Sequence, residues 1–190
     1  MNYLAHAFLS NNDSHLLVGN FIADHLRGNN FGNLPSGIIK GIHLHRKIDT
    51  FTDTHPEFKK AKRIFYKGFE KHSGILVDIY FDHLLAKSFE KYSSTPLHEF
   101  SHAVYRIYAD HTHHLPQSSS RFLDYVMKNN VYHAYASSEG IEKVLYHLSH
   151  RIQHNVQLDA SMRLFEANES ELIKSFDIFF TDACKTFLID

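Results

Sequence analysis

The amino-acid sequence predicts an all-α fold, and three features of the chain support this prediction. Apolar residues recur at helical spacing along nearly the whole length. Residues that typically begin or end helices interrupt that pattern at regular intervals. No segment shows the alternation of apolar and polar residues that is typical of a half-buried strand.

Start and stop signals divide the first half of the chain into four helices. Polar residues or a proline precede each one, and Gly28 and Pro56 follow the last turns of the first two. Thr54 and Glu57 have the spacing of a capping box at the start of the third. The expected helices are residues 12–28, 36–55, 56–71 and 73–92.

The second half shows the same pattern. Thr95 and Pro96 open a helix that is followed by a serine-rich loop. Three further segments have apolar residues along one helical face, and they increase in length along the chain. The last of them has a break near Asn168. These expected helices are residues 95–111, 121–127, 138–153 and 159–187. Because repeats and linkers are absent from the sequence, we predict one domain over residues 1–190, a bundle of seven to eight helices.

Composition narrows the classes of function. The formal net charge of −1 argues against a dedicated nucleic-acid-binding protein, which is normally basic. Cys184 is the only cysteine, so no intrachain disulfide can form, and a reducing cytoplasm is the expected compartment. The first residues lack a signal-peptide pattern, and no segment has the roughly 18 apolar residues of a membrane span. We therefore expect a cytoplasmic protein with neither a membrane nor a nucleic-acid partner.

Titratable residues one turn apart lie within the apolar stripes of two expected helices. His45 and Asp49 have this spacing, and so do Asp78 and Asp82. A buried carboxylate is costly without a positive charge beside it, and two carboxylates one turn apart also repel each other. Asp24, on the apolar face of the first expected helix, adds a third acidic segment. Such oxygen and nitrogen donors suit Mn²⁺, Mg²⁺ or Fe²⁺ and predict a metal-dependent hydrolase.

Structural roles are the alternative for the same residues. A hydrogen bond between His45 and Asp49 can simply orient two helices, and Asp24 can accept a bond from a buried donor. Arg46 can clamp a phosphate bidentately, or it can form a salt bridge with Asp53 or Asp24. The spacing alone leaves both kinds of role open.

Two further histidines are candidates for the site. His6, in the short apolar opening of the chain, is expected to fold inward beside the second helix as a metal ligand. His83 follows Asp82 directly and is rotated by about 100° around the helix. It can reach an ion that lies between the two faces, act as a general acid near a leaving group, or lie on the surface.

The expected helix 56–71 carries a basic face. Its cations include Lys59, Lys60, Arg63 and Lys67. A face of this kind is commonly just solvated. Because it directly follows the candidate site in the sequence, it can also guide an acidic partner by electrostatic steering.

Five segments, taken together and in order, resemble the acyl carrier protein phosphodiesterase family. They are MNYLAH, GNFIADHLRG, LP, GIHLHRKIDTFTDTHP and SGILVDIYFDHLLA. The resemblance is strong over the first half of the chain and continues, more weakly, through the C-terminal helices.

The resemblance implies an all-helical, HD-domain-like phosphohydrolase that depends on a divalent metal, with Mn²⁺ as the expected ion. Enzymes of this family hydrolyse the phosphodiester that joins 4′-phosphopantetheine to a serine of holo-acyl carrier protein, which they release as the apo-protein. Holo-acyl carrier protein, which is acidic, would then contact the basic face. The ligands implied by position are His6, Asp24, His45, Asp49, Asp78 and Asp82, with His83 beside them.

The chain departs from the family pattern at two places. The His-Asp order of HD enzymes is reversed where Asp82 precedes His83, which leaves the ligand set open. Asn130 and Val131 stand where family members often carry Asp-Trp, in a segment that can grip the carrier protein or its prosthetic arm. Two rival functions remain: hydrolysis of a nucleotide or other small phosphodiester, and non-catalytic binding of carrier protein or metal.

Overall fold

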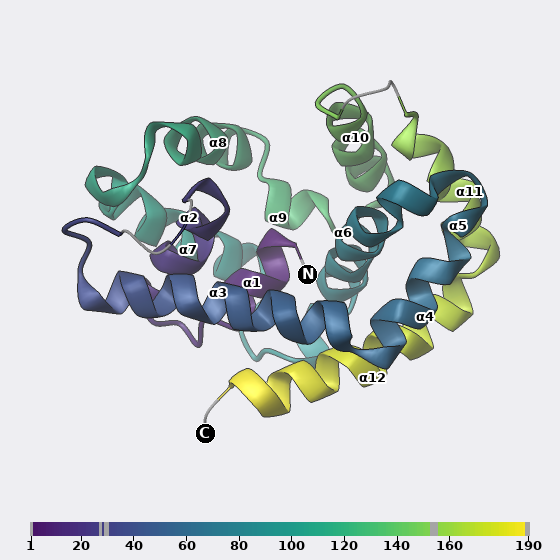
Figure 1. The fold of residues 1–190 in the computed structure, drawn as a ribbon, viewed down its shortest axis with the longest axis horizontal. Coiled ribbons are helices and arrows are strands. Elements are labelled where there is room, and N and C mark those ends of the chain that lie inside the picture. The colour runs from purple at the N-terminus through teal and green to yellow at the C-terminus, as the bar shows by residue number, and fades with distance from the viewer. Residues whose placement is uncertain (1, 27, 29–30, 153–155, 189–190) are drawn as a thin grey trace.

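The computed structural model describes residues 2–26, 28, 31–152 and 156–188. Every regular element in these ranges is helical, which confirms the all-α prediction (Figure 1). The α-helices are α1 (Tyr3–Phe8), α2 (Ser14–Ile22), α3 (Ser36–Thr54), α4 (Pro56–Ile64), α5 (Tyr66–Phe69), α6 (Ser73–Lys87), α7 (Leu97–Asp110), α8 (Gln117–Lys128), α9 (Val131–Ala134), α10 (Ser138–Ser149), α11 (Met162–Ala167) and α12 (Glu169–Phe187). The 3₁₀ turns are η1 (Ala23–His25), η2 (Glu70–His72), η3 (Phe89–Lys91), η4 (Thr112–His114) and η5 (Leu158–Ser161). None of the described helices is both long and apolar enough to span a bilayer.

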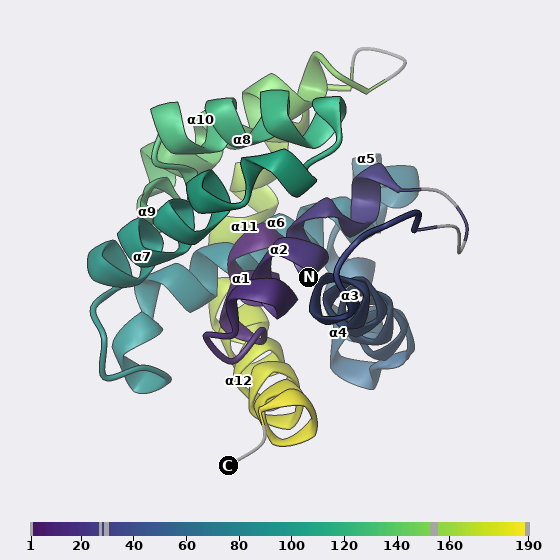
Figure 2. The same cartoon turned by 90° about the vertical axis from the view of Figure 1, so that its left-hand side faces the viewer.

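Helix α6 lies at the centre of the molecule. Most of its residues are buried, because its sequence is apolar on nearly all sides. Helices α8 and α10 lie on one side of it, and α3, α4 and α12 lie on the other (Figures 1 and 2). Buried apolar side chains from both sides form one core cluster. The site residues described below therefore come from segments far apart in the sequence.

Several predicted boundaries are confirmed. Helix α3 begins at Ser36 and ends at Thr54, where the extended backbone before Pro56 stops it. The long C-terminal pattern breaks at Asn168, between α11 and α12. In both cases a local backbone preference decides the boundary, so the sequence could predict it.

Other expected helices are shorter or divided. The pattern over residues 12–28 is α-helical only to Ile22 and continues as the tighter turn η1. The pattern over residues 56–71 is interrupted because Gly68 has a φ of 93°, in the left-handed region. The described chain consequently has more and shorter helical segments than the seven to eight expected.

Three local expectations were wrong. The capping box does not form, because the Thr54 hydroxyl donates back within α3 and the His55 ring accepts the Glu57 N–H instead. The serine-rich segment expected to be a loop forms the first turn of α8. The helix expected over residues 138–153 ends at Ser149, and residue 153 lies outside the described residues.

Two glycines allow α2 and α3 to touch backbone to backbone. A Cβ atom at Gly41 would lie 2.9 Å from the Cα of Gly19, and one at Gly19 would collide with the Ile38 carbonyl oxygen. Any larger residue at either position forces the helices apart. Since Asn20 lies on α2 and His45 lies on α3, this crossing sets the distance between two residues of the candidate site.

We expect Gly19→Ala to lower the free energy of unfolding by about 2–3 kcal/mol, because the added methyl group meets backbone that cannot rotate away. Urea unfolding of the metal-free protein measures this. The matched control is Gly74→Ala on α6, where the nearest atom to the new Cβ would be a flexible Lys62 carbon at 3.9 Å. The control should keep or slightly raise stability. Equal free energies of unfolding for the two variants would contradict the close backbone contact between α2 and α3.

Candidate metal centre

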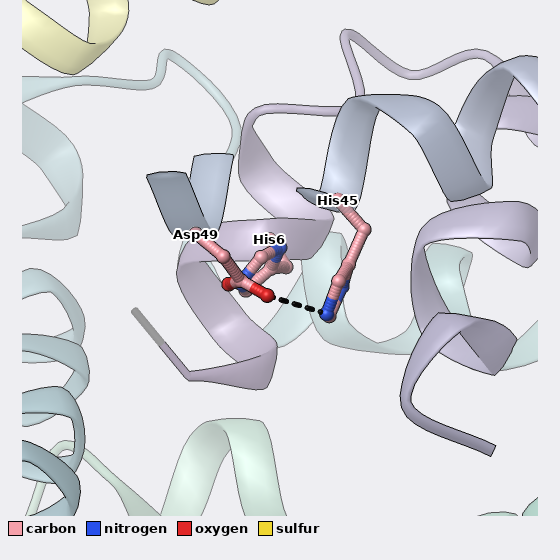
Figure 3. A group of neighbouring side chains, drawn as sticks. All are labelled: His6, His45 and Asp49. Atoms are coloured by element: carbon pink, nitrogen blue, oxygen red, sulfur yellow. Dashed lines mark ion pairs between the residues drawn. The ribbon is translucent and has the colours of Figure 1, made fainter. Parts of the chain in front are cut away.

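Two buried histidines from different helices stack against each other. His6 lies on α1 and His45 on α3, and each side chain is almost completely buried. Their ring centroids are 4.2 Å apart, with planes inclined by 23°. Figure 3 shows both rings beside the carboxylate of Asp49. The structure thus brings together three of the residues that the sequence predicted as ligands.

The side-chain amide of Asn20 holds both rings. Its Oδ1 atom lies 2.8 Å from Nδ1 of His6 and 2.9 Å from Nδ1 of His45. Its Nδ2 atom donates to the His6 carbonyl and to the Ser10 hydroxyl, so the orientation of the amide is fixed. Both Nδ1 atoms must then donate to Oδ1, which directs both Nε2 atoms to the opposite side.

Carboxylates surround the two Nε2 atoms. Asp49 lies 3.2 Å from Nε2 of His6 and 3.1 Å from Nε2 of His45. Asp24 lies 3.1 Å from the same nitrogen of His45. About half of each aspartate side chain is exposed, whereas the histidines are buried. The cluster is therefore closed on the imidazole side and open to solvent on the carboxylate side.

The pKa values of these groups reflect a shared proton. Burial opposes a charge on His45, but hydrogen bonds with Asp24 and Asp49 outweigh it and raise the pKa of His45 to about 9. Burial lowers the pKa of His6 instead, so this ring is neutral near pH 7. Burial raises the pKa of Asp49, yet the hydrogen bond and charge of His45, with the His6 ring close by, bring it well below its ordinary value. One imidazolium ion thus neutralises part of the acidic charge.

The donor set fits a divalent cation. One atom each from His6, His45 and Asp49 lies within 4.8 Å of the others. Nε2 of His6 is buried and has no hydrogen-bond partner in the described part of the chain, although an Asp49 oxygen is close. A lone pair directed at carboxylate oxygens in this way is what a bound cation would satisfy. His6, His45 and Asp49 can therefore hold a divalent metal ion.

A cleft of about 1240 Å³ opens over the cluster. We call its acidic side the acidic floor, formed by Asp24, Asp49, Asp53 and Asp78. Asp78, one of the predicted ligands, lies on this floor but outside the group of three. Val131 also lines the cleft.

Asp82 does not join the cluster that the sequence suggested. It is fully buried, and its two oxygens accept the N–H groups of Leu4 at 2.8 Å and Ala5 at 3.1 Å. These N–H groups in the first turn of α1 have no partner within the helix. Burial raises the pKa of Asp82 to about 7, although the two N–H groups lower it. Its physical role is to hold the helix that carries His6.

The two residues predicted to be catalytic lie elsewhere as well. His83 is buried, its Nδ1 atom 2.6 Å from the Tyr135 carbonyl oxygen and its ring against Phe165. Arg46 donates to the Gly28 carbonyl oxygen at 2.6 Å, and its guanidinium lies over the Phe31 ring. Neither side chain lines the cleft. Each side chain is held away from the cleft by its hydrogen bond to a backbone carbonyl oxygen.

Sequence reasoning missed several residues of this site. Asn20 lies one turn before Asp24, so both residues share a helix face. That spacing could have indicated that Asn20 belongs to the site. His147, His150, Arg121 and Arg151 also line the cleft. No spacing in the sequence connects α8 and α10 with α3, so nothing in the sequence could have placed them there.

Comparisons with known proteins agree with the motifs. A model of the family described as acyl carrier protein phosphodiesterase matches residues 1–183. Three proteins named acyl carrier protein phosphodiesterase are similar to this chain. The one from Photorhabdus laumondii is 31% identical over 80% of this chain and 77% of its own length. The Yersinia pestis protein is 33% identical over 95% and 93%, respectively. The Pectobacterium atrosepticum protein is 41% identical over 53% and 52%.

No solved structure matches the chain, so the expected likeness to HD-domain folds stays a prediction. The family match spans nearly the whole sequence, including the segments that carry His6, Asp24, His45 and Asp49. This chain belongs to the acyl carrier protein phosphodiesterase family.

Proposed function

We propose that this protein hydrolyses the phosphodiester between 4′-phosphopantetheine and the serine of holo-acyl carrier protein, giving the apo-protein and free 4′-phosphopantetheine. The family supports the substrate. The observation that carries the chemistry is the pair of buried histidines whose Nε2 atoms converge on two solvent-accessible carboxylates in a large cleft.

The ligands in this proposal are His6, His45, Asp49 and Asp24, with Asp78 as a further candidate on the floor of the cleft. Two imidazoles among the donors favour Mn²⁺ or Fe²⁺ over Mg²⁺, and Mn²⁺ is our first choice. A divalent cation held there would supply a Lewis acid that activates water and offsets charge on the phosphoryl group. Asn20 keeps both rings in the tautomer that such ligation requires.

The rest of the cleft suits the prosthetic arm. The arm carries a phosphate at one end and a chain of amides and methylenes beyond it. Beside the acidic floor, the cleft is lined by aromatic and aliphatic residues that include Tyr3, Phe122, Tyr125 and Leu148. Such a surface can pack against methylenes while tyrosine hydroxyls contact the amides.

The basic face of α4 and α5 is the proposed contact for the carrier protein. Lys59, Arg63 and Lys67 are exposed, while Lys60 is paired with Glu171 at 3.4 Å. Lys62, on the same helix, reaches the first turn of α6, next to a residue that lines the cleft. Acidic carrier protein bound to this face would lie near the entrance of the cleft.

The substrate is tested by incubating the protein and Mn²⁺ with holo-acyl carrier protein and weighing the carrier protein by mass spectrometry. We expect the apo-protein mass to appear. Asp49→Asn should lower the rate at least about a hundredfold, because Asp49 contacts both histidines. Asp110→Asn, at an exposed site on α7, is the matched control and should keep the wild-type rate.

Two outcomes would redirect this assignment. Cleavage of small phosphodiesters with holo-carrier protein left intact would favour a small-molecule phosphohydrolase. Binding of carrier protein without cleavage, in both the wild type and Asp49→Asn, would favour a non-catalytic binding module.

Metal binding should depend on pH through His45. In the metal-free protein the pKa of His45 is about 9, so a cation must displace its proton at neutral pH, whereas His6 is already neutral. We expect about one proton to be released per Mn²⁺ bound near pH 7, and the affinity to rise up to about tenfold per pH unit below pH 9. Calorimetry in buffers of different ionisation enthalpy measures the proton count. An affinity independent of pH would contradict this ligand role.

Charge reversal tests the docking face. Lys59→Glu combined with Lys67→Glu should lower kcat/KM for holo-carrier protein by about tenfold at low salt, and the difference should shrink as salt screens the charges. Lys91→Glu, on η3, is the matched control. An equal loss in all variants would mean that only net charge matters, and no loss in the double variant would place docking elsewhere.

A further inference from the structure

Two arginines line the cleft apart from the predicted ligands. Arg121 lies on α8, and Arg151 follows the end of α10. Both are exposed, and neither guanidinium forms a hydrogen bond or an ion pair with any residue that the structure describes. Together with His147 and His150 they form what we call the basic wall.

The basic wall and the acidic floor meet near Asp24. Tyr3 packs on Phe122 with ring centroids 4.6 Å apart, and His25 lies 6.0 Å from the same ring. This contact places α8, and with it Arg121, beside the turn that carries Asp24. Arg151 and His25 line the same cleft as Asp24.

Two guanidinium groups in one cleft, with no partner among the described residues, can bind an anion. The carboxylates of the floor line the same cleft, yet within the described residues they form no ion pair with Arg121 or Arg151. Asp49 and Asp24 bond to histidines instead. A phosphate group with two free oxygens can face a cation held by the floor with one oxygen and a guanidinium with the other. Arg46, bound to the Gly28 carbonyl, cannot take that place without losing this bond.

We propose that Arg121 and Arg151 bind the non-bridging phosphate oxygens of the substrate from the basic wall, across the cleft from His6, His45 and Asp49. This inference rests on the proposed function and deepens it, because it assigns the recognition of the phosphate to residues outside the ligand cluster. Such contacts fix the phosphorus atom above the floor, in reach of water there. The same contacts would make the protein bind 4′-phosphopantetheine more tightly than pantetheine, which lacks the phosphate.

The experiment measures hydrolysis of holo-acyl carrier protein and, separately, binding of 4′-phosphopantetheine and of pantetheine without its phosphate. The variants are Arg121→Gln, Arg151→Gln and their combination. Arg106→Gln, at an exposed position of α7 outside the cleft, is the matched control. All binding is measured by calorimetry with Mn²⁺-loaded protein.

Each single variant should lower kcat/KM about tenfold or more, since a charge-assisted hydrogen bond is lost. Wild-type protein should bind 4′-phosphopantetheine at least about tenfold more tightly than pantetheine, and the double variant should lose that preference while its affinity for pantetheine stays unchanged. Arg121→Lys and Arg151→Lys should recover part of the loss, because they restore the charge without the planar fork.

Three results would overturn the proposal. One is wild-type turnover in both Arg→Gln variants. Another is equal wild-type affinity for 4′-phosphopantetheine and pantetheine. A third is a similar loss in Arg106→Gln, which would show a general effect of charge. If the wild type binds 4′-phosphopantetheine through these arginines but does not cleave holo-carrier protein, the basic wall is supported and the proposed hydrolysis fails.

Discussion

The carboxamide of Asn20 determines how the candidate site is built, because a single oxygen atom accepts from both buried imidazoles. An oxygen that serves two rings forces both to present the same nitrogen to the same side. The amide nitrogen bonds to the His6 carbonyl and the Ser10 hydroxyl, so the group cannot turn over to offer its nitrogen to the rings. Three segments are joined at this one side chain: α1, α2 and α3.

Two backbone contacts support this arrangement from outside. The close approach at Gly19 and Gly41 lets α2 lie against α3 without intervening side chains. The carboxylate of Asp82 holds the first turn of α1 from α6. Burying that carboxylate raises its pKa to about 7, so the fold keeps an unfavourable group in its core. What it stabilises in return is the position of the helix that carries His6.

The cleft separates acidic from basic groups. Carboxylates gather on the floor, where His45 neutralises part of their charge in the metal-free protein. Arginines and histidines lie on the wall contributed by α8 and α10. Within the described residues the arginines of the wall form no ion pair with the carboxylates of the floor, so the wall can receive an anion while His6, His45 and Asp49 hold a cation. A phosphodiester together with a divalent cation has the charges that this arrangement would accommodate.

The sequence by itself determined the all-α class, the limits of α3 and the break at Asn168, since helical periodicity and local backbone preferences are properties of short segments. It also marked His6, Asp24, His45 and Asp49, because the polar residues stand out against apolar stripes. Only the tertiary structure decided that Asp82 faces α1, that His83 and Arg46 turn toward carbonyl groups, and that Arg121 and Arg151 reach the cleft. Spacing along one helix fixes which residues share a face, but what that face meets depends on how separate helices pack.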